Sequence, residues 1–172
     1  MEQVLGPVHL VRIGRVRFPV AAVIGKAPDG SAVTHARLGR DGWLRVYFGP
    51  GRRVRVSDGT EWRIRATGYG PYIAPMVTND NGKLALALPH GKRSYGINGR
   101  DFAFNLYPAG RLGIRRPSWV LREHETELAT LDAGSLNAQH PVPLAAALLC
   151  WTVAKFGIPG EAALEVPSMQ WK

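Results

Sequence analysis

One apolar segment near the end of the chain constrains the fold more than any other feature of the sequence. The residues from Val142 to Val153 are all apolar except Thr152. A helix that is apolar on every side must be buried on every side or lie in a membrane. The run is much shorter than the roughly 18–20 residues that a membrane span needs. The sequence therefore predicts a buried helix over residues 143–156.

The residues around this segment are typical of helix ends. Either Asn137 or His140 is expected to precede the helix, and Pro141 and Pro143 suit its first turn, where a backbone N–H is not needed. Gly157 is a typical stop signal because glycine readily adopts the backbone conformation that ends a helix.

The rest of the chain consists of short strand-like runs separated by Gly, Pro, Asn and Asp. About twelve strands at such spacing predict an all-β sandwich or barrel. With the helix, the expected fold is a mainly β protein: a single antiparallel barrel around one buried, hydrophobic C-terminal helix. A turn is expected at Asn98-Gly99. The predicted strands include 16–24, Ala32–Leu38, Trp43–Phe48, Arg52–Val56, 60–67, Tyr72–Thr78, Leu84–Leu88, Arg93–Ile97, Phe102–Leu106, Trp119–His124 and Glu127–Leu131.

The hairpin on either side of Ser57-Asp58-Gly59 is the best-specified local unit. A three-residue loop with Gly59 in the left-handed conformation sets Val54 opposite Trp62 and Arg55 opposite Glu61. A two-residue loop would mix apolar and charged residues on each face, because a slip of one residue inverts every side chain. The three-residue loop is therefore predicted.

Length and cysteine content indicate one soluble domain. A chain of 172 residues is expected to form a single domain over 1–172, with 157–172 as a short tail. The lone Cys150 excludes an internal disulfide. The first residues lack the pattern of a secretory signal. A cytoplasmic location, including a peripheral position at a membrane, is the expectation.

Positive charge is concentrated in the first part of the chain. Residues 1–122 carry 20 Lys and Arg against 7 Asp and Glu, whereas residues 123–172 carry 2 against 6, which gives the net charge of +9. Such a field favours polyanions such as acidic lipid head groups or nucleic acid. The alternative is compositional, because an Arg-, Ala-, Gly- and Pro-rich sequence is also what a GC-rich genome encodes.

The predicted architecture resembles the tubby C-terminal-like superfamily, which includes plant LURP-one-related proteins and phospholipid scramblases. The residues that carry the resemblance are VTNDNGKLALALP (77–89), SWVLREHETELATLDA (118–133) and PLAAALLCWTVAKF (143–156). The resemblance covers most of the chain as architecture, without a specific motif. It implies a barrel threaded by its C-terminal helix and binding of membrane phosphoinositides or other lipids by basic residues. The scramblase calcium loop has no counterpart in this chain.

The strongest candidate site is a group of arginines on the predicted hairpin. Guanidinium groups match phosphate oxygens in a bidentate manner. The alternative is a solvated sheet face, with Arg55 paired to Glu61. A phosphate-binding backbone nest at Gly49-Pro50-Gly51 is a further candidate, for which a simple turn is the alternative. The predicted anion-binding residues are Arg53, Arg55, Arg63 and Arg65.

Other sites have weaker support in the sequence. No histidine has metal-ligand spacing with another histidine or with Cys150, and no serine lies in a nucleophile elbow. Tyr69 and Tyr72 are candidates for a nucleic-acid stacking platform, with packing as the alternative. Lys92-Arg93 and Arg115-Arg116 are basic pairs on expected loops. We expect no metal and no cofactor.

The sequence thus favours a non-catalytic binding module that presents a basic barrel surface to anionic phospholipid or another phosphorylated ligand. A nucleic-acid-binding or protein-interaction adaptor is the alternative, because it would use the same positive charge. The third reading is an enzyme whose dispersed catalytic residues converge at the mouth of the barrel. No transmembrane segment is expected, and the oligomeric state is left open.

Overall fold

The structure is a computed structural model that describes residues 1–13, 20–40, 46, 49–67, 74–90, 94–109, 118–132 and 134–156. In this part of the chain, twelve antiparallel strands form a closed barrel in the order β1-β12-β11-β10-β9-β8-β7-β6-β5-β4-β3-β2. The predicted fold class is confirmed. The strands are β1 (Gln3–Ile13), β2 (Val20–Lys26), β3 (Ala32–Leu38), β4 (Arg52–Val56), β5 (Glu61–Thr67), β6 (Ala74–Asn79), β7 (Gly82–Pro89), β8 (Tyr95–Gly99), β9 (Ala103–Ala109), β10 (Ser118–Glu123), β11 (Thr126–Asp132) and β12 (Ser135–Pro143).

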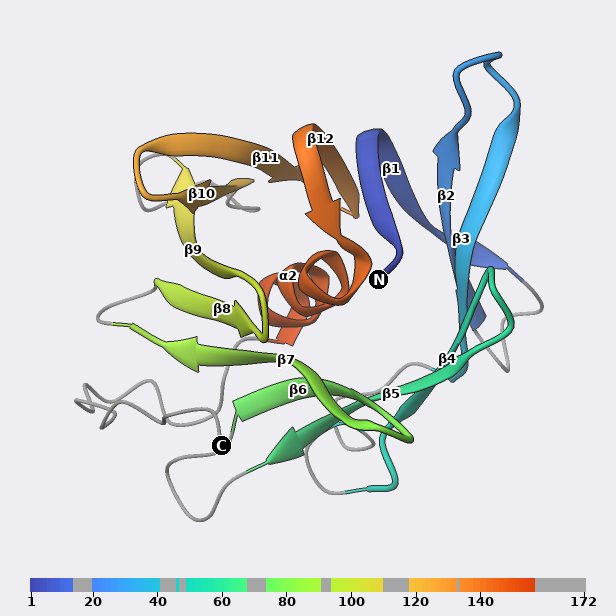
Figure 1. Cartoon of the computed structure of the whole chain (residues 1–172), viewed down its shortest axis with the longest axis horizontal. Coiled ribbons are helices and arrows are strands. Elements are labelled where there is room, and N and C mark those ends of the chain that lie inside the picture. Colours follow the sequence, from blue (N-terminus) through green and yellow to red (C-terminus); the bar gives the residue numbers. More distant parts are fainter. Residues whose placement is uncertain are drawn as a thin grey trace.

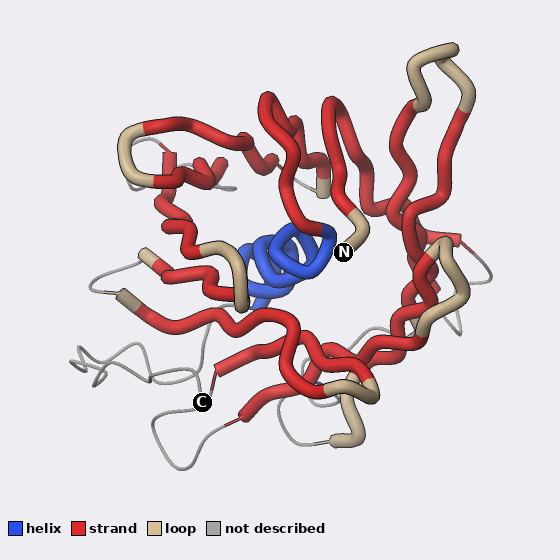
Figure 2. The backbone as a smooth tube through the Cα atoms, in the orientation of Figure 1, coloured by secondary structure: helices blue, strands red, loops and turns tan. Residues whose placement is uncertain are grey.

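The helix α2 (Leu144–Phe156) lies inside this ring of strands (Figures 1 and 2). It packs against β1, β6, β7, β8 and β12. A barrel of about eight strands is filled by its own side chains, whereas a wider barrel leaves space in its interior. The apolar helix fills part of that space. Ala145, Ala146 and Ala147 are completely buried, and their small side chains let strands approach the helix backbone closely.

The two ends of the chain close the barrel. Strand β1 pairs with β12, with Val4 opposite Val142 and Val8 opposite Leu136. The sequence interpretation missed both strands. It placed Asn137, His140, Pro141 and Pro143 before or within the first helical turn, but all four belong to β12, and the helix begins at Leu144.

The first helical turn is capped by main chain rather than by a polar side chain. The Leu144 N–H donates to the backbone oxygen of Glu2 at 2.8 Å. The first N–H groups of a helix have no partner within it, so this contact satisfies one of them and ties the helix to β1. The Thr152 hydroxyl donates to the Leu148 carbonyl at 2.8 Å, so the polar group of this buried residue is also satisfied.

Two further strand predictions need correction or fall outside the described residues. Asn98 and Gly99 belong to β8, and the turn follows them: the Gly99 N–H donates to the Phe102 oxygen at 2.9 Å. Of the predicted strand Trp43–Phe48 only Val46 is described. It is buried and its backbone is helical, so the strand prediction is wrong at that residue. The tail 157–172 lies outside the described residues.

None of the helices in the described part of the chain has the length and apolar character required to cross a bilayer.

Cys150 provides a direct test of how well the helix is buried. Its side chain is fully buried, and desolvation raises the pKa of the thiol to about 12. The thiolate is the nucleophilic form, so the native thiol should be inert at neutral pH. We expect Cys150 to react with a thiol reagent such as Ellman's reagent only at the rate of unfolding, and rapidly in denaturant. Fast labelling of the native protein would contradict the central position of the helix.

Candidate anion-binding face

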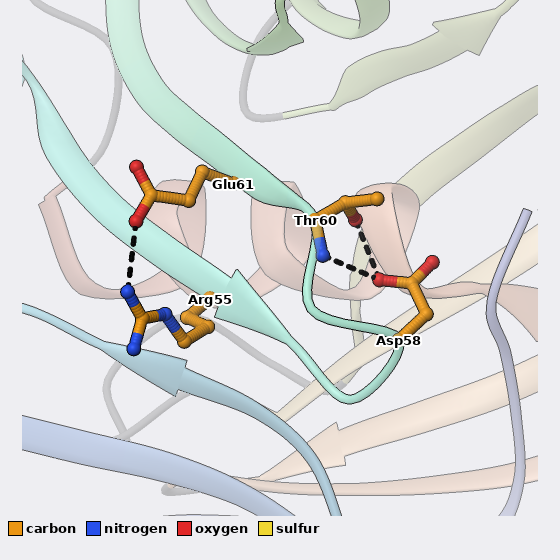
Figure 3. Close-up of polar contacts among 4 residues, drawn as sticks. All are labelled: Arg55, Asp58, Thr60 and Glu61. Atoms are coloured by element: carbon orange, nitrogen blue, oxygen red, sulfur yellow. Dashed lines mark hydrogen bonds and ion pairs between the residues drawn. The ribbon is translucent and has the colours of Figure 1, made fainter.

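The β4–β5 hairpin has the predicted three-residue loop. Gly59 has a φ of 86°, and the Val56 N–H donates to the Thr60 oxygen at 3.0 Å. Figure 3 shows the Asp58 carboxylate accepting hydrogen bonds from both the Thr60 hydroxyl at 2.7 Å and the Thr60 N–H at 2.8 Å. These bonds, the hydroxyl first, lower the pKa of Asp58 below its usual value because they favour the charged carboxylate. The turn is therefore held by local hydrogen bonds.

The register that follows from this turn is the predicted one. Val54 lies opposite Trp62 and Arg55 lies opposite Glu61. Val54 and Trp62 are buried in the main core, while the alternate side chains face outward. The structure therefore places all four predicted arginines on one exposed face, namely Arg53, Arg55, Arg63 and Arg65.

Two basic residues that sequence reasoning missed extend this face onto neighbouring strands. Arg37 of β3 is exposed and lies directly opposite Arg55. Lys83 of β7 is exposed and lies opposite Thr78, which in turn lies opposite Arg63. Alternation within β3 would have shown Arg37 to be outward, but only strand pairing shows what it faces. We call this set the basic face: Arg37, Arg53, Arg55, Arg63, Arg65 and Lys83.

The basic face contains two pairs of directly opposed arginines. Arg53 lies opposite Arg63, and Arg37 lies opposite Arg55. Directly opposite side chains on one face have Cβ atoms about 4.5–5.5 Å apart, and like charges in such positions are destabilising. These two arginine pairs therefore do not stabilise the pairing of their strands.

Partial compensation comes from two contacts. The Arg55 Nη2 lies 3.1 Å from the Glu61 Oε1, an ion pair in which both side chains are largely exposed (Figure 3). Arg63 donates from Nη1 to the Pro50 carbonyl at 3.2 Å. Within the described residues, Arg37, Arg53 and Arg65 form no side-chain hydrogen bond or ion pair. The face thus keeps an excess of unneutralised guanidinium groups.

Arg52, the remaining arginine of β4, does not belong to this face. It is 7% exposed, and its Nε donates to the Gly39 carbonyl at 2.9 Å. Its position follows from alternation, because it is one residue away from Arg53. Arg52 therefore contributes to the contact between β4 and the end of β3.

The Gly49-Pro50-Gly51 segment packs against β5 instead of forming an open nest. Gly51 is buried with a φ of 84°, and a Cβ built on it would lie 2.8 Å from the Ile64 carbonyl oxygen. The Pro50 carbonyl accepts the hydrogen bond from Arg63. These contacts support the simple turn rather than a phosphate-binding nest.

Replacing Gly51 with alanine should therefore be costly. The left-handed backbone alone costs an L-residue about 1–2 kcal/mol, and forcing a methyl group against the Ile64 carbonyl adds about 1–3 kcal/mol. Gly6 is the matched control, since its φ is 73° and a Cβ there would meet nothing within 4 Å. Urea unfolding should show a larger loss of stability for Gly51→Ala than for Gly6→Ala. Equal losses would show that the Ile64 contact costs nothing.

Two histidines in the described part of the chain have side-chain partners. His35 Nδ1 lies 3.0 Å from Glu2 Oε1, but its Nε2 would lie only 2.7 Å from a Cβ at Gly25. The other ring nitrogen of His35 therefore packs against Gly25 of β2. His9 Nδ1 lies 2.8 Å from the Ser135 hydroxyl on the exposed surface.

Other sequence candidates are absent from, or outside, the described structure. No group of three or more His, Cys, Asp or Glu residues that could hold a metal occurs in the described part of the chain. Tyr69, Tyr72, Lys92-Arg93 and Arg115-Arg116 lie outside the described residues.

Comparisons with known proteins find no similarity: no protein-family model matches the sequence, and neither a curated protein nor a solved structure matches the chain.

Proposed function

We propose that this protein is a non-catalytic binding module whose basic face contacts anionic phospholipid or another phosphorylated ligand. The observation that carries the proposal is the presence of two pairs of arginines that the strand register places opposite each other, Arg53 with Arg63 and Arg37 with Arg55. Each pairing places two arginines directly opposite each other on neighbouring strands, where like charges are destabilising. A phosphate between them would remove the repulsion and accept hydrogen bonds from both forks.

The spacing of these pairs favours a ligand surface with several phosphates. Arg53 and Arg55 are two residues apart on β4, which corresponds to about 7 Å along a strand. Arg65 and Lys83 extend the same face over β5 and β7. Several head groups of a membrane surface could be contacted at once, each basic residue contributing roughly 1 kcal/mol.

The composition of the face favours lipid over single-stranded nucleic acid. Nucleic-acid platforms combine positive charge with aromatic side chains on which bases stack. The exposed large hydrophobic residues in the described part of the chain are Met1, Leu5, Val11, Ile13 and Tyr107, and none of them lies on β3, β4, β5 or β7. The described residues of the basic face therefore offer contacts to phosphate groups but no exposed aromatic ring on which a base could stack.

The kinship with the tubby C-terminal-like superfamily is also a proposal. It is supported by the closed barrel of twelve strands with its C-terminal helix inside. An enzyme is less well supported, because Cys150 is buried in α2 and the Nε2 of His35 packs against Gly25 of β2.

Vesicle sedimentation tests the proposal. The purified protein is mixed with vesicles of phosphatidylcholine alone or of phosphatidylcholine with phosphatidylserine, across a series of NaCl concentrations. We expect binding to the acidic vesicles only, weakening as salt screens the attraction. A labelled random-sequence oligonucleotide is titrated in parallel. Tighter binding to the oligonucleotide, or no binding to acidic vesicles, would overturn the lipid proposal.

A further inference from the structure

A pocket of about 320 Å³ lies at the end of the barrel where α2 begins. Its walls come from the N-terminal end of β1, the β8–β9 turn, β9, the end of β10, β11 and the last residues of β12. Pro141 and Pro143 form the β12 side of its rim. The volume is at the small end of the range for ligand sites, which is about 300–1,000 Å³. A compact ligand would fit this pocket.

Two carboxylates line the pocket, Asp101 from the β8–β9 turn and Glu123 from the end of β10, and both residues are exposed. Within the described residues, neither forms a side-chain hydrogen bond or an ion pair. The ion pair of this hairpin instead joins Arg122 to Glu127, with 3.8 Å between Nη2 and Oε2. The pocket therefore presents two carboxylates without a bonded partner among the described residues, in a chain whose net charge is +9.

A stacked aromatic pair forms another wall. The rings of Phe102 and Phe104 have centroids 4.9 Å apart and an interplanar angle of 24°, and both residues line the pocket. A Cβ at Gly99 would overlap the Phe102 ring, so the glycine creates the space that the ring occupies. A pocket lined by carboxylates and by aromatic side chains suits an organic cation with an apolar chain.

The pocket and the basic face belong to different parts of the barrel. The pocket draws on β1 and on β9 to β12, whereas the basic face lies on β3, β4, β5 and β7. In the strand order, β11 and β5 are separated by the same number of strands in both directions, so they lie across the barrel from each other (Figure 1). A ligand in the pocket would not contact the basic face.

We propose that this pocket binds a primary alkylammonium group. Asp101 and Glu123 pair with the ammonium, while the alkyl chain lies against Phe102, Phe104 and Leu128. The group would come either from a free amine or from the lysine side chain of a peptide, since both present the same chemistry. The carboxylates alone are too few for a protein-derived metal site.

Calorimetric titration of the full-length protein tests this proposal with 1,5-diaminopentane, N-acetyl-lysine methylamide and the neutral 1,5-pentanediol. We expect at least one ammonium compound to bind and the diol not to bind. Asp101→Asn combined with Glu123→Gln should weaken ammonium binding by about tenfold or more, because both charge-assisted contacts are lost. Phe102→Leu should weaken it less, since the apolar contact remains but the ring is lost.

The matched control is Glu125→Gln combined with Asp132→Asn, which removes the same charge from exposed residues outside the pocket lining. It should leave ammonium binding unchanged, and melting curves should show that both double variants fold. The proposal fails if no ammonium compound binds, if the diol binds equally well, if Mg²⁺ displaces the amine, or if the two double variants behave alike. Vesicle binding by the variant with Asp101→Asn and Glu123→Gln should persist. The proposal for the pocket and the proposal for the basic face are therefore tested independently.

Discussion

Replacing Leu148 or Trp151 with aspartate should abolish soluble expression of the protein. Leu148 is 1% exposed and Trp151 is 5% exposed, both within the helix at the centre of the barrel. Loss of a buried Leu side chain costs about 2–5 kcal/mol, and an unpaired buried charge adds several more. The sum approaches the whole stability of a typical domain, about 5–15 kcal/mol. Soluble yield and near-ultraviolet circular dichroism measure the outcome.

Two further variants serve as controls for this prediction. Leu5→Asp introduces the same charge at a leucine that is 57% exposed on β1, and it should fold with little change in melting temperature. Leu148→Ala should remain soluble but lose about 3 kcal/mol or more of stability in urea unfolding, because a cavity replaces the side chain. If Leu148→Asp folds with an unchanged melting temperature, the helix does not lie at the centre of the barrel.

The largest expected effect on binding comes from the basic face. Replacing Arg53, Arg55, Arg63 and Arg65 together with glutamine should weaken binding to acidic vesicles by about two to three orders of magnitude, since each basic residue contributes roughly 1 kcal/mol. The salt dependence of binding should flatten as well, because fewer charges remain to be screened. Stability should change little, because the four side chains are exposed and the Arg55–Glu61 pair is a surface ion pair.

The control for this variant removes equal charge elsewhere. Arg12, Lys26, Arg100 and Arg122 are exposed and lie outside the basic face. Changing these four to glutamine lowers the net charge by the same amount, so it tests placement against total charge. Vesicle binding should fall by no more than about tenfold. Equal losses in the two variants would show that net charge, and not the opposed arginines, attracts the membrane.

The accuracy of the sequence interpretation depended on how local each contact is. The β4–β5 register was predictable because a short turn fixes it, and only the three-residue loop puts Val54 opposite Trp62. The helix was predictable because a continuous apolar run of that length must be buried. The outward direction of the four predicted arginines followed from alternation along two paired strands.

Contacts between distant segments were not predictable in the same way. Strands β1 and β12 carry prolines and few continuous apolar residues, and each finds its partner at the opposite end of the chain. The same limit hid the pairing of Arg37 with Arg55, since nothing in either segment specifies that β3 and β4 are neighbours. The pocket was hidden for the same reason, because it assembles from five strands and the β8–β9 turn.

The sequence by itself determined the mainly β class, the buried helix, the hairpin register and the excess of positive charge. These properties depend on periodicity, turn chemistry and composition, which act over a few residues at a time. Only the tertiary structure decided that the barrel closes through β1 and β12, that arginines of different strands face one another, and that Asp101 and Glu123 share a pocket with two phenylalanines. Those arrangements depend on which distant strands pair and in which register. The pairing is decided by the burial of apolar side chains around the helix, to which strands from the whole chain contribute together.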